Sequence, residues 1–180
     1  MTDDPTPSGD DPPLDHETTF GAENAPDQTP DDAFVGAFAL LMRGERPSYA
    51  ALRTESGLDL PRARRDDSGS YRDSLLATLG ERLGLDPKRD LVASGVPRAH
   101  LNSRLCGKGS GEPRWYVAEF FVVRLYGKAW PDKLAARDDV VWLTGEEVMA
   151  GGKDGLRLAD DTLSLLRIAE AIPPDEQRST

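Results

Sequence analysis

The chain has 180 residues and a formal net charge of −10, but that charge is confined to one end. Residues 1–32 contain ten Asp or Glu and no Lys or Arg, so the remaining 22 of the 32 acids are matched by all 22 bases. A body without a basic excess disfavours a nucleic-acid partner. No apolar run approaches the roughly 18 residues that a membrane span needs.

The N-terminal segment 1–32 is rich in Pro, Asp and Thr and has almost no large apolar residues. Such a segment cannot bury enough surface to offset the entropy lost on ordering, so we expect a disordered acidic tail. An interaction tail that docks on a basic partner is the alternative. One domain is expected over 33–172, followed by a C-terminal tail over 173–180. Because the N-terminus lacks the basic start and apolar core of a secretion signal, we expect a cytoplasmic protein.

Runs of β-branched and aromatic residues predict strands, and apolar residues at helical spacing predict helices. In chain order, the expected elements are strands at 34–42 and 49–53, a helix at 71–83, strands at 90–96, 114–126 and 140–143, and helices at 145–150 and 160–171. Strands and helices do not alternate strictly, which favours a mixed sheet with helices packed on it.

Three arginines, Arg62, Arg64 and Arg65, precede the expected helix at 71–83. Guanidinium groups bind phosphate oxygens bidentately, so this loop could hold an anion without a metal ion. Alternatively, the arginines alternate with Asp66 and Asp67 and form a solvated surface loop whose charges compensate each other.

The helix expected at 71–83 has one apolar stripe of four leucines, Leu75, Leu76, Leu79 and Leu83. Glu81 lies about 200° around the helix from its nearest leucines in that stripe, so Thr78, Glu81 and Arg82 should face outward. Glu81 is then either a solvated residue that pairs with an arginine or a metal ligand. Gly80 costs the helix up to about 1 kcal/mol relative to alanine, and a close approach of the sheet is one possible reason for it.

The segment 114–126 is apolar on both of its faces, which predicts a central strand covered on both sides. Glu119 is the exception on one face, and a buried carboxylate needs a partner or a function. A salt bridge to an arginine such as Arg104, a position near the rim, and a substrate or metal ligand all remain open. Cys106 and His100 are six residues apart, which is roughly 20 Å if the segment between them is extended, too far to form a catalytic pair unless the segment folds back.

The residues from Leu60 to Leu85 resemble the Nudix box, G-x5-E-x7-R-E-U-x-E-E-x-G-U, in which U is apolar. The positions that match are Leu79, Glu81, Gly84 and Leu85. The positions that differ are Ala63 for the first glycine, Gly69 for the first glutamate, Ala77 and Thr78 for the arginine and glutamate in mid-helix, and Arg82 for the last glutamate. Opening strands followed by Leu60-Pro61, and a strand, tryptophan, turn and helix over 140–148, extend the resemblance to about 33–170.

The resemblance implies an α/β (α+β) fold, a Nudix-like α/β/α sandwich with a mixed β-sheet. In that family the glutamates hold divalent metal ions that clamp a diphosphate, and most of them are missing here. We therefore expect a nucleotide-binding or protein-interaction module with weak or no hydrolase activity, no assignable catalytic residue and no cofactor. Glu81 and Glu119 are the candidates for residual metal binding, and Arg62 and Arg82 for binding an anion or substrate.

The alternative is an active hydrolase of nucleoside diphosphate derivatives that depends on Mg or Mn. Glu81, Glu119 and either Asp66 or Asp67 would then rebuild a displaced metal site. A nucleotide-like ligand or a protein is the expected partner in either case, and neither nucleic acid nor a membrane is expected.

Overall fold

The structure is a computed structural model that describes residues 33–44, 47–66, 69–106, 113–174 and 177. The predicted acidic tail and most of the predicted C-terminal tail lie outside the described residues. In chain order, the elements are β1 (Phe34–Arg43), β2 (Ser48–Thr54), β3 (Gly57–Asp59), β4 (Arg62–Arg64), α1 (Tyr71–Leu83), β5 (Leu91–Ala93), β6 (Ala99–Cys106), β7 (Pro113–Leu125), α2 (Trp130–Ala135), β8 (Val140–Thr144), α3 (Gly145–Ala150), β9 (Gly152–Lys153), β10 (Leu156–Arg157) and α4 (Asp160–Ile168).

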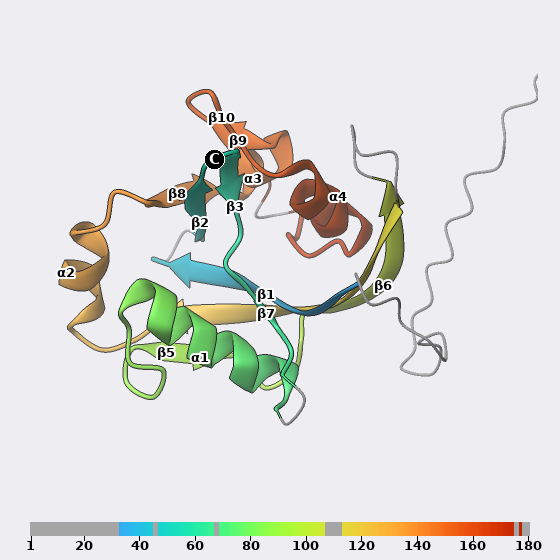
Figure 1. The fold of residues 1–180 in the computed structure, drawn as a ribbon. Helices are drawn as coiled ribbons and strands as arrows, with labels where there is room; N and C mark the ends of the chain where they lie inside the picture. Colours follow the sequence, from blue (N-terminus) through green and yellow to red (C-terminus); the bar gives the residue numbers. More distant parts are fainter. Residues whose placement is uncertain (1–32, 45–46, 67–68, 107–112, 175–176, 178–180) are drawn as a thin grey trace, which may run out of the picture.

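An eight-stranded mixed sheet forms the centre of the domain (Figure 1). Its longest ladder is parallel and joins β1 to β7 from Phe34↔Tyr116 to Met42↔Arg124. On its other side β7 pairs antiparallel with β5 and β6, which confirms the prediction of a central strand. β1 also pairs antiparallel with β2 and β4, and β2 pairs with β3 and β8.

Each face of the sheet has its own hydrophobic core because side chains along β1 alternate between the faces. Phe38 and Leu40 pack in the core that includes residues of α3 and α4, whereas Ala39 and Leu41 pack in the core that includes α1 and α2. The result is an α/β/α sandwich with a mixed sheet, as the fold prediction stated (Figure 1). None of the helices in the described part has the length and apolar character needed to cross a bilayer.

Several elements differ from the prediction for local reasons. α4 ends at Ile168 rather than at Ala171, because Glu170 adopts a left-handed backbone with φ of 47° before the prolines are reached. β5 covers only 91–93, and Gly95 and Pro97 follow it on the way to β6. The short β3, β4, α2, β9 and β10 were not predicted as separate elements, since two to six residues are too few to show a period.

Candidate functional site

Helix α1 presents the box residues on its outer face. It begins after Ser70, whose Oγ accepts a hydrogen bond from the Asp73 N–H at 3.1 Å, and it ends at Gly84, whose φ of 67° favours glycine. The predicted stripe is confirmed for three of its four leucines, Leu75, Leu79 and Leu83, which are buried, while Leu76 is half-buried. Glu81 and Arg82 are exposed, so the helix offers them to solvent rather than to the core.

Gly80 is explained by a close approach, but not by one of the sheet. A Cβ at this position would lie 2.6 Å from Pro87 Cγ and 2.9 Å from the Leu85 carbonyl oxygen. The chain that leaves α1 therefore folds back over the last turn of the helix, and the Leu85 N–H donates to the Gly80 carbonyl at 3.0 Å.

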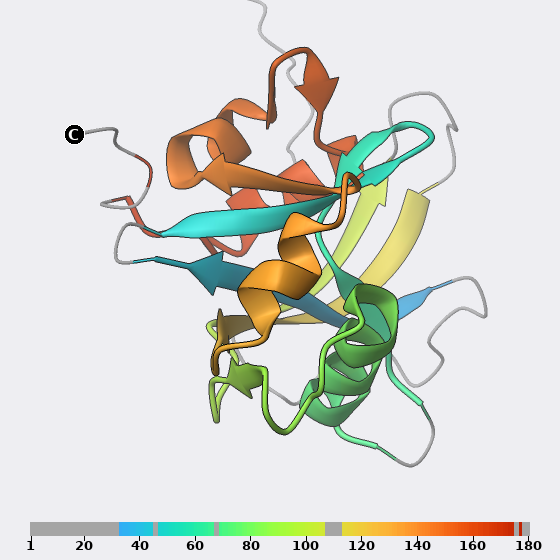
Figure 2. The ribbon, with the colours of Figure 1, turned by 90° about the vertical axis from the view of Figure 1, so that its left-hand side faces the viewer.

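The loop between α2 and β8 lies close to α1 (Figure 2) and carries a strongly held carboxylate. The Arg53 backbone N–H donates to the Asp139 carbonyl at 2.7 Å, which extends the β2–β8 ladder and fixes the loop. The Arg137 guanidinium donates from Nε to Asp139 Oδ1 at 2.8 Å and from Nη2 to Oδ2 at 2.5 Å. This bidentate hydrogen bond lowers the pKa of Asp139, and the positive charge of Arg82 contributes to the lowering.

The positive charge of Arg82 on α1 contributes to lowering the pKa of Asp139 on the loop, although the two side chains form no ion pair. Arg82 stands where the box has its last glutamate, and Asp139 is already paired with Arg137. The carboxylate that matches the box, Glu81, is on the adjacent exposed position of α1. This part of α1 therefore carries a positive charge at a position where the box has a carboxylate.

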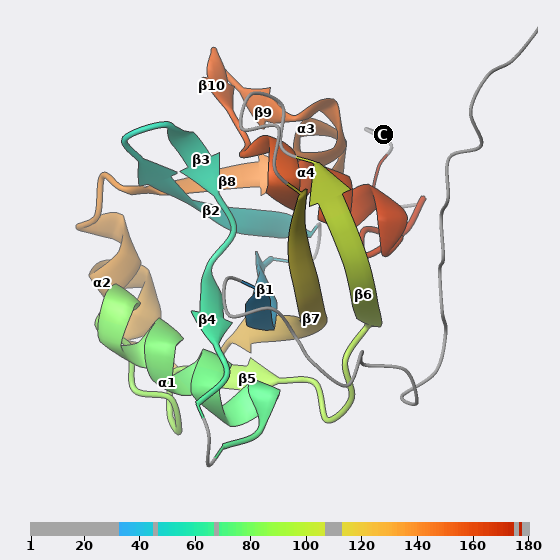
Figure 3. The same ribbon diagram turned by 45° about the vertical axis from the view of Figure 1, so that its right-hand side comes forward.

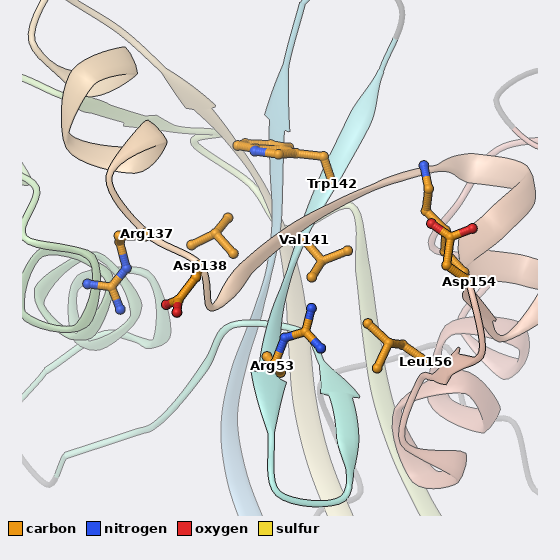
Figure 4. A pocket seen from close by; sticks show the side chains of 9 residues that line it. Arg53, Arg137, Asp138, Val141, Trp142, Asp154 and Leu156 are labelled. Carbon is orange, nitrogen blue, oxygen red and sulfur yellow. The ribbon is translucent and has the colours of Figure 1, made fainter.

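An open pocket of about 580 Å³ continues from this loop along β8 (Figure 4). Arg53, Arg137 and Asp138 line one part of it, and Val141 and Leu156 give it an apolar wall. Val140, Trp142, Lys153 and Asp154 complete the lining. Lys153 forms an ion pair with Glu147, with 3.0 Å between Nζ and Oε1. The Arg53 side chain forms no ion pair with any residue that the structure describes.

Glu119 lies away from this pocket and has a partner that the sequence did not indicate. It stands directly opposite His100 in the β6–β7 ladder, and His100 Nδ1 lies 3.5 Å from Glu119 Oε1. Arg104, the partner considered from the sequence, is opposite Trp115 instead.

The three arginines before α1 do not form one cluster at the box helix. Arg62 pairs with Asp59 at 3.0 Å and lies over the Phe38 ring, on the face of the sheet away from α1. Arg64 donates to a backbone carbonyl, and Arg65 lies 5.1 Å above the ring of Tyr71. The structure therefore places Arg62, one of the two candidates for binding an anion, on the face of the sheet away from the helix that carries the other, Arg82.

Among the residues that the structure describes, no three His, Cys, Asp or Glu side chains gather where they could hold a metal ion. Glu81, Glu119 and Asp66 are not brought together in such a group, and Asp67 lies outside the described residues. At Gly69, the position of the first box glutamate, an added Cβ would lie 2.5 Å from Asp66 Oδ1, so a side chain there would require a local shift.

No family model and no curated protein matches the sequence, but solved structures match its fold. One is NrtR of Shewanella oneidensis complexed with a 27mer DNA, with a TM-score of 0.52 and 17% identity over 75% of this chain. Another is a MutT/Nudix family protein from Listeria innocua, with a TM-score of 0.50 and 17% identity over 83% of this chain and 98% of that one. This domain has the Nudix fold. The chain spans 59% of the length of the Shewanella protein, and identities this low establish the fold alone.

In this Nudix fold, the sequence located α1 but did not indicate the charged residues around the α2–β8 loop. Arg53, Arg137 and Asp139 come from β2 and from the loop before β8. The signal available was the charged run 137–139 directly before a strand, since loops at strand ends gather functional side chains. The effect of Arg82 on Asp139 spans more than fifty residues of sequence and depends on the tertiary structure.

Proposed function

We propose that this Nudix-fold domain binds an anionic ligand of the nucleoside diphosphate type without a divalent metal, and that it has weak or no hydrolase activity. The observation that supports this is the arrangement of Arg82, Asp139 and Arg137 between α1 and the α2–β8 loop. The Arg82 guanidinium stands at a position where the box has a metal-binding glutamate.

Metal binding is disfavoured on charge and on ligand number. Mg²⁺ needs near-octahedral oxygen ligands, and Thr78 and Arg82 occupy two positions that the box fills with glutamate. A divalent cation would also have to compete with Arg137 for the Asp139 carboxylate. Since one charge-stabilising group is typically worth about 3 kcal/mol of barrier, loss of two or more would slow hydrolysis by roughly 10⁴-fold.

Ligand binding is supported by two arginine side chains that have no acidic partner among the described residues. The Arg53 backbone is hydrogen-bonded to Asp139, and the charge of Arg82 acts on the Asp139 carboxylate; neither arginine forms an ion pair within the described part of the chain. Either guanidinium could take two phosphate oxygens. Val141 and Leu156 would contact the less polar moiety of the ligand.

Calorimetric titration with ADP, ADP-ribose and UDP-glucose, in EDTA and in millimolar Mg²⁺, tests the proposal. We expect binding of at least one compound in EDTA, and no increase in affinity with Mg²⁺. Arg53→Gln and Arg82→Gln should each weaken binding about tenfold or more, because a hydrogen bond to a charged group contributes about 1.5–3 kcal/mol. Arg89→Gln is the control, since Arg89 is 86% exposed and pairs only loosely with Asp86.

The alternative, an active Mg- or Mn-dependent hydrolase with a rearranged metal site, predicts a different result. Metal-dependent turnover of these compounds that Glu81→Gln abolishes would contradict the proposal and support the alternative. Binding that requires Mg²⁺ would also contradict it.

A further inference from the structure

A second group of arginines lies where β1 begins, on the face of the sheet away from α1. Arg62 and Arg64 both lie over the Phe34 ring, with their Cζ atoms 5.6 and 5.7 Å from its centroid. Arg62 is neutralised by Asp59. Arg64 donates from Nη1 to the Ala33 carbonyl at 3.0 Å and forms no ion pair with the residues that the structure describes.

A third arginine, Arg114, lies on the same face across β1. It precedes Tyr116 by two residues on β7, and Tyr116 is the partner of Phe34 in the parallel ladder. The Tyr116 hydroxyl donates to Asp161 at 2.5 Å and is also hydrogen-bonded to Arg114. The Asp161 carboxylate therefore already accepts a hydrogen bond from Tyr116, and Arg114 forms no ion pair with any residue in the described ranges. We call Arg62, Arg64 and Arg114 the arginine surface.

The arginine surface flanks a stretch of β7 that is paired on one side only. Residues 113–115 pair with β6, whereas the ladder with β1 starts at Phe34↔Tyr116, so no described strand covers their other side (Figure 3). The chain enters β1 on this side, because Phe34 pairs with Tyr116 and Arg64 holds the Ala33 carbonyl. The acidic residues that precede Ala33 in the sequence therefore join the domain beside the arginine surface.

We propose that the arginine surface is the docking site of this chain's own acidic N-terminal segment. That segment carries ten carboxylates and no Lys or Arg, and it joins the domain at Ala33, whose carbonyl accepts a hydrogen bond from Arg64. Asp32 is consequently within about 4 Å of Ala33, measured between Cα atoms. Guanidinium and carboxylate form strong charge-assisted hydrogen bonds, and here the two sets are covalently linked. The segment would then exclude other polyanions from this surface.

Paramagnetic relaxation in the full-length protein tests this docking. A nitroxide is attached at Thr18→Cys in a Cys106→Ser background, and the amide signals of β4 and the start of β7 are recorded. We expect these signals to lose intensity at low salt and to recover near 1 M salt, where the screening length falls to about 3 Å. Arg64→Gln with Arg114→Gln should restore the signals. Arg124→Gln should not, because Arg124 is an exposed residue at the far end of the same strand.

Three results would overturn the inference. The first is broadening of the amide signals that survives both high salt and the double arginine substitution. The second is an Arg124→Gln variant that restores the signals as much as the double substitution does. The third is broadening in a mixture of spin-labelled and isotope-labelled protein, which would show that the segment docks on another copy. Asp31→Asn with Asp32→Asn provides a second test from the side of the segment, because it leaves every described residue unchanged. It should weaken the broadening, and no change would contradict the docking.

Discussion

Replacement of Gly80 by alanine should destabilise the fold, although alanine is the better helix former. The new Cβ would meet the Pro87 ring at 2.6 and 2.9 Å and the Leu85 carbonyl oxygen at 2.9 Å. Neither neighbour can move freely, because Leu85 is buried and its N–H is bound to the Gly80 carbonyl. Overpacking costs about 2 kcal/mol, within a range of about 1–3, and the helix propensity of alanine returns about 1 kcal/mol, so we expect a net loss of about 1 kcal/mol and at most about 2.

Urea denaturation followed by circular dichroism measures this loss, provided that the m-value does not change. Ala77→Gly is the control for propensity, since Ala77 is exposed in the same helix, and it should cost about 1 kcal/mol. In a Pro87→Ala background the cost of Gly80→Ala should fall but not vanish, because the Leu85 carbonyl remains. A Gly80→Ala protein as stable as the natural one would refute the packing described for this helix end.

Three further predictions concern the core, an ion pair and the metal site. Leu79→Ala should lower the free energy of unfolding by about 2–5 kcal/mol, as measured by urea denaturation, because Leu79 is 2% exposed, and a loss below about 0.5 kcal/mol would contradict its burial. Asp90 accepts a hydrogen bond from Lys133 at 2.7 Å, which lowers its pKa below the unfolded value of about 3.9. Its contribution is therefore complete above that value and lost as the pH falls through the folded pKa, so the stability difference between the natural protein and Asp90→Asn should stay constant above about pH 5 and shrink as the pH falls below about 4. The double variant Thr78→Glu with Arg82→Glu should gain affinity for Mg²⁺, and Mg²⁺ should then raise its melting temperature but not that of the natural protein. At a Mg²⁺ concentration of a hundred times Kd, binding stabilises the folded state by about 2.7 kcal/mol. A folded variant without this gain would count against the alignment of α1 with the box.

Local signals were enough to predict α1 and the centre of the sheet. A leucine stripe predicts the helix at 71–83, and two apolar faces mark β7 as an interior strand. These features depend only on residues near one another in the chain, and sequence periodicity reports them directly.

The candidate site was only half predictable because its two sides come from distant segments. Glu81 and Arg82 could be placed on an outer helical face, but nothing in the spacing of residues showed that the charge of Arg82 would act on Asp139. The partner of Glu119 depends on the register of β6 against β7, and a shift of a few residues would have selected a side chain other than His100. The face on which Arg62 lies could not be predicted either, since a three-residue strand shows no period.

The parallel ladder between β1 and β7 also sets the order in which the domain can fold. Residue numbers in every pair of this ladder differ by 82, as for Phe34 and Tyr116. The first strand of the domain therefore lacks its principal neighbour until more than a hundred residues of the chain exist, and closing so long a loop costs entropy before any pairing compensates. We expect slow folding for a domain of this size, with the apolar β1 exposed in the meantime and dependent on its hairpin with β2 for early protection.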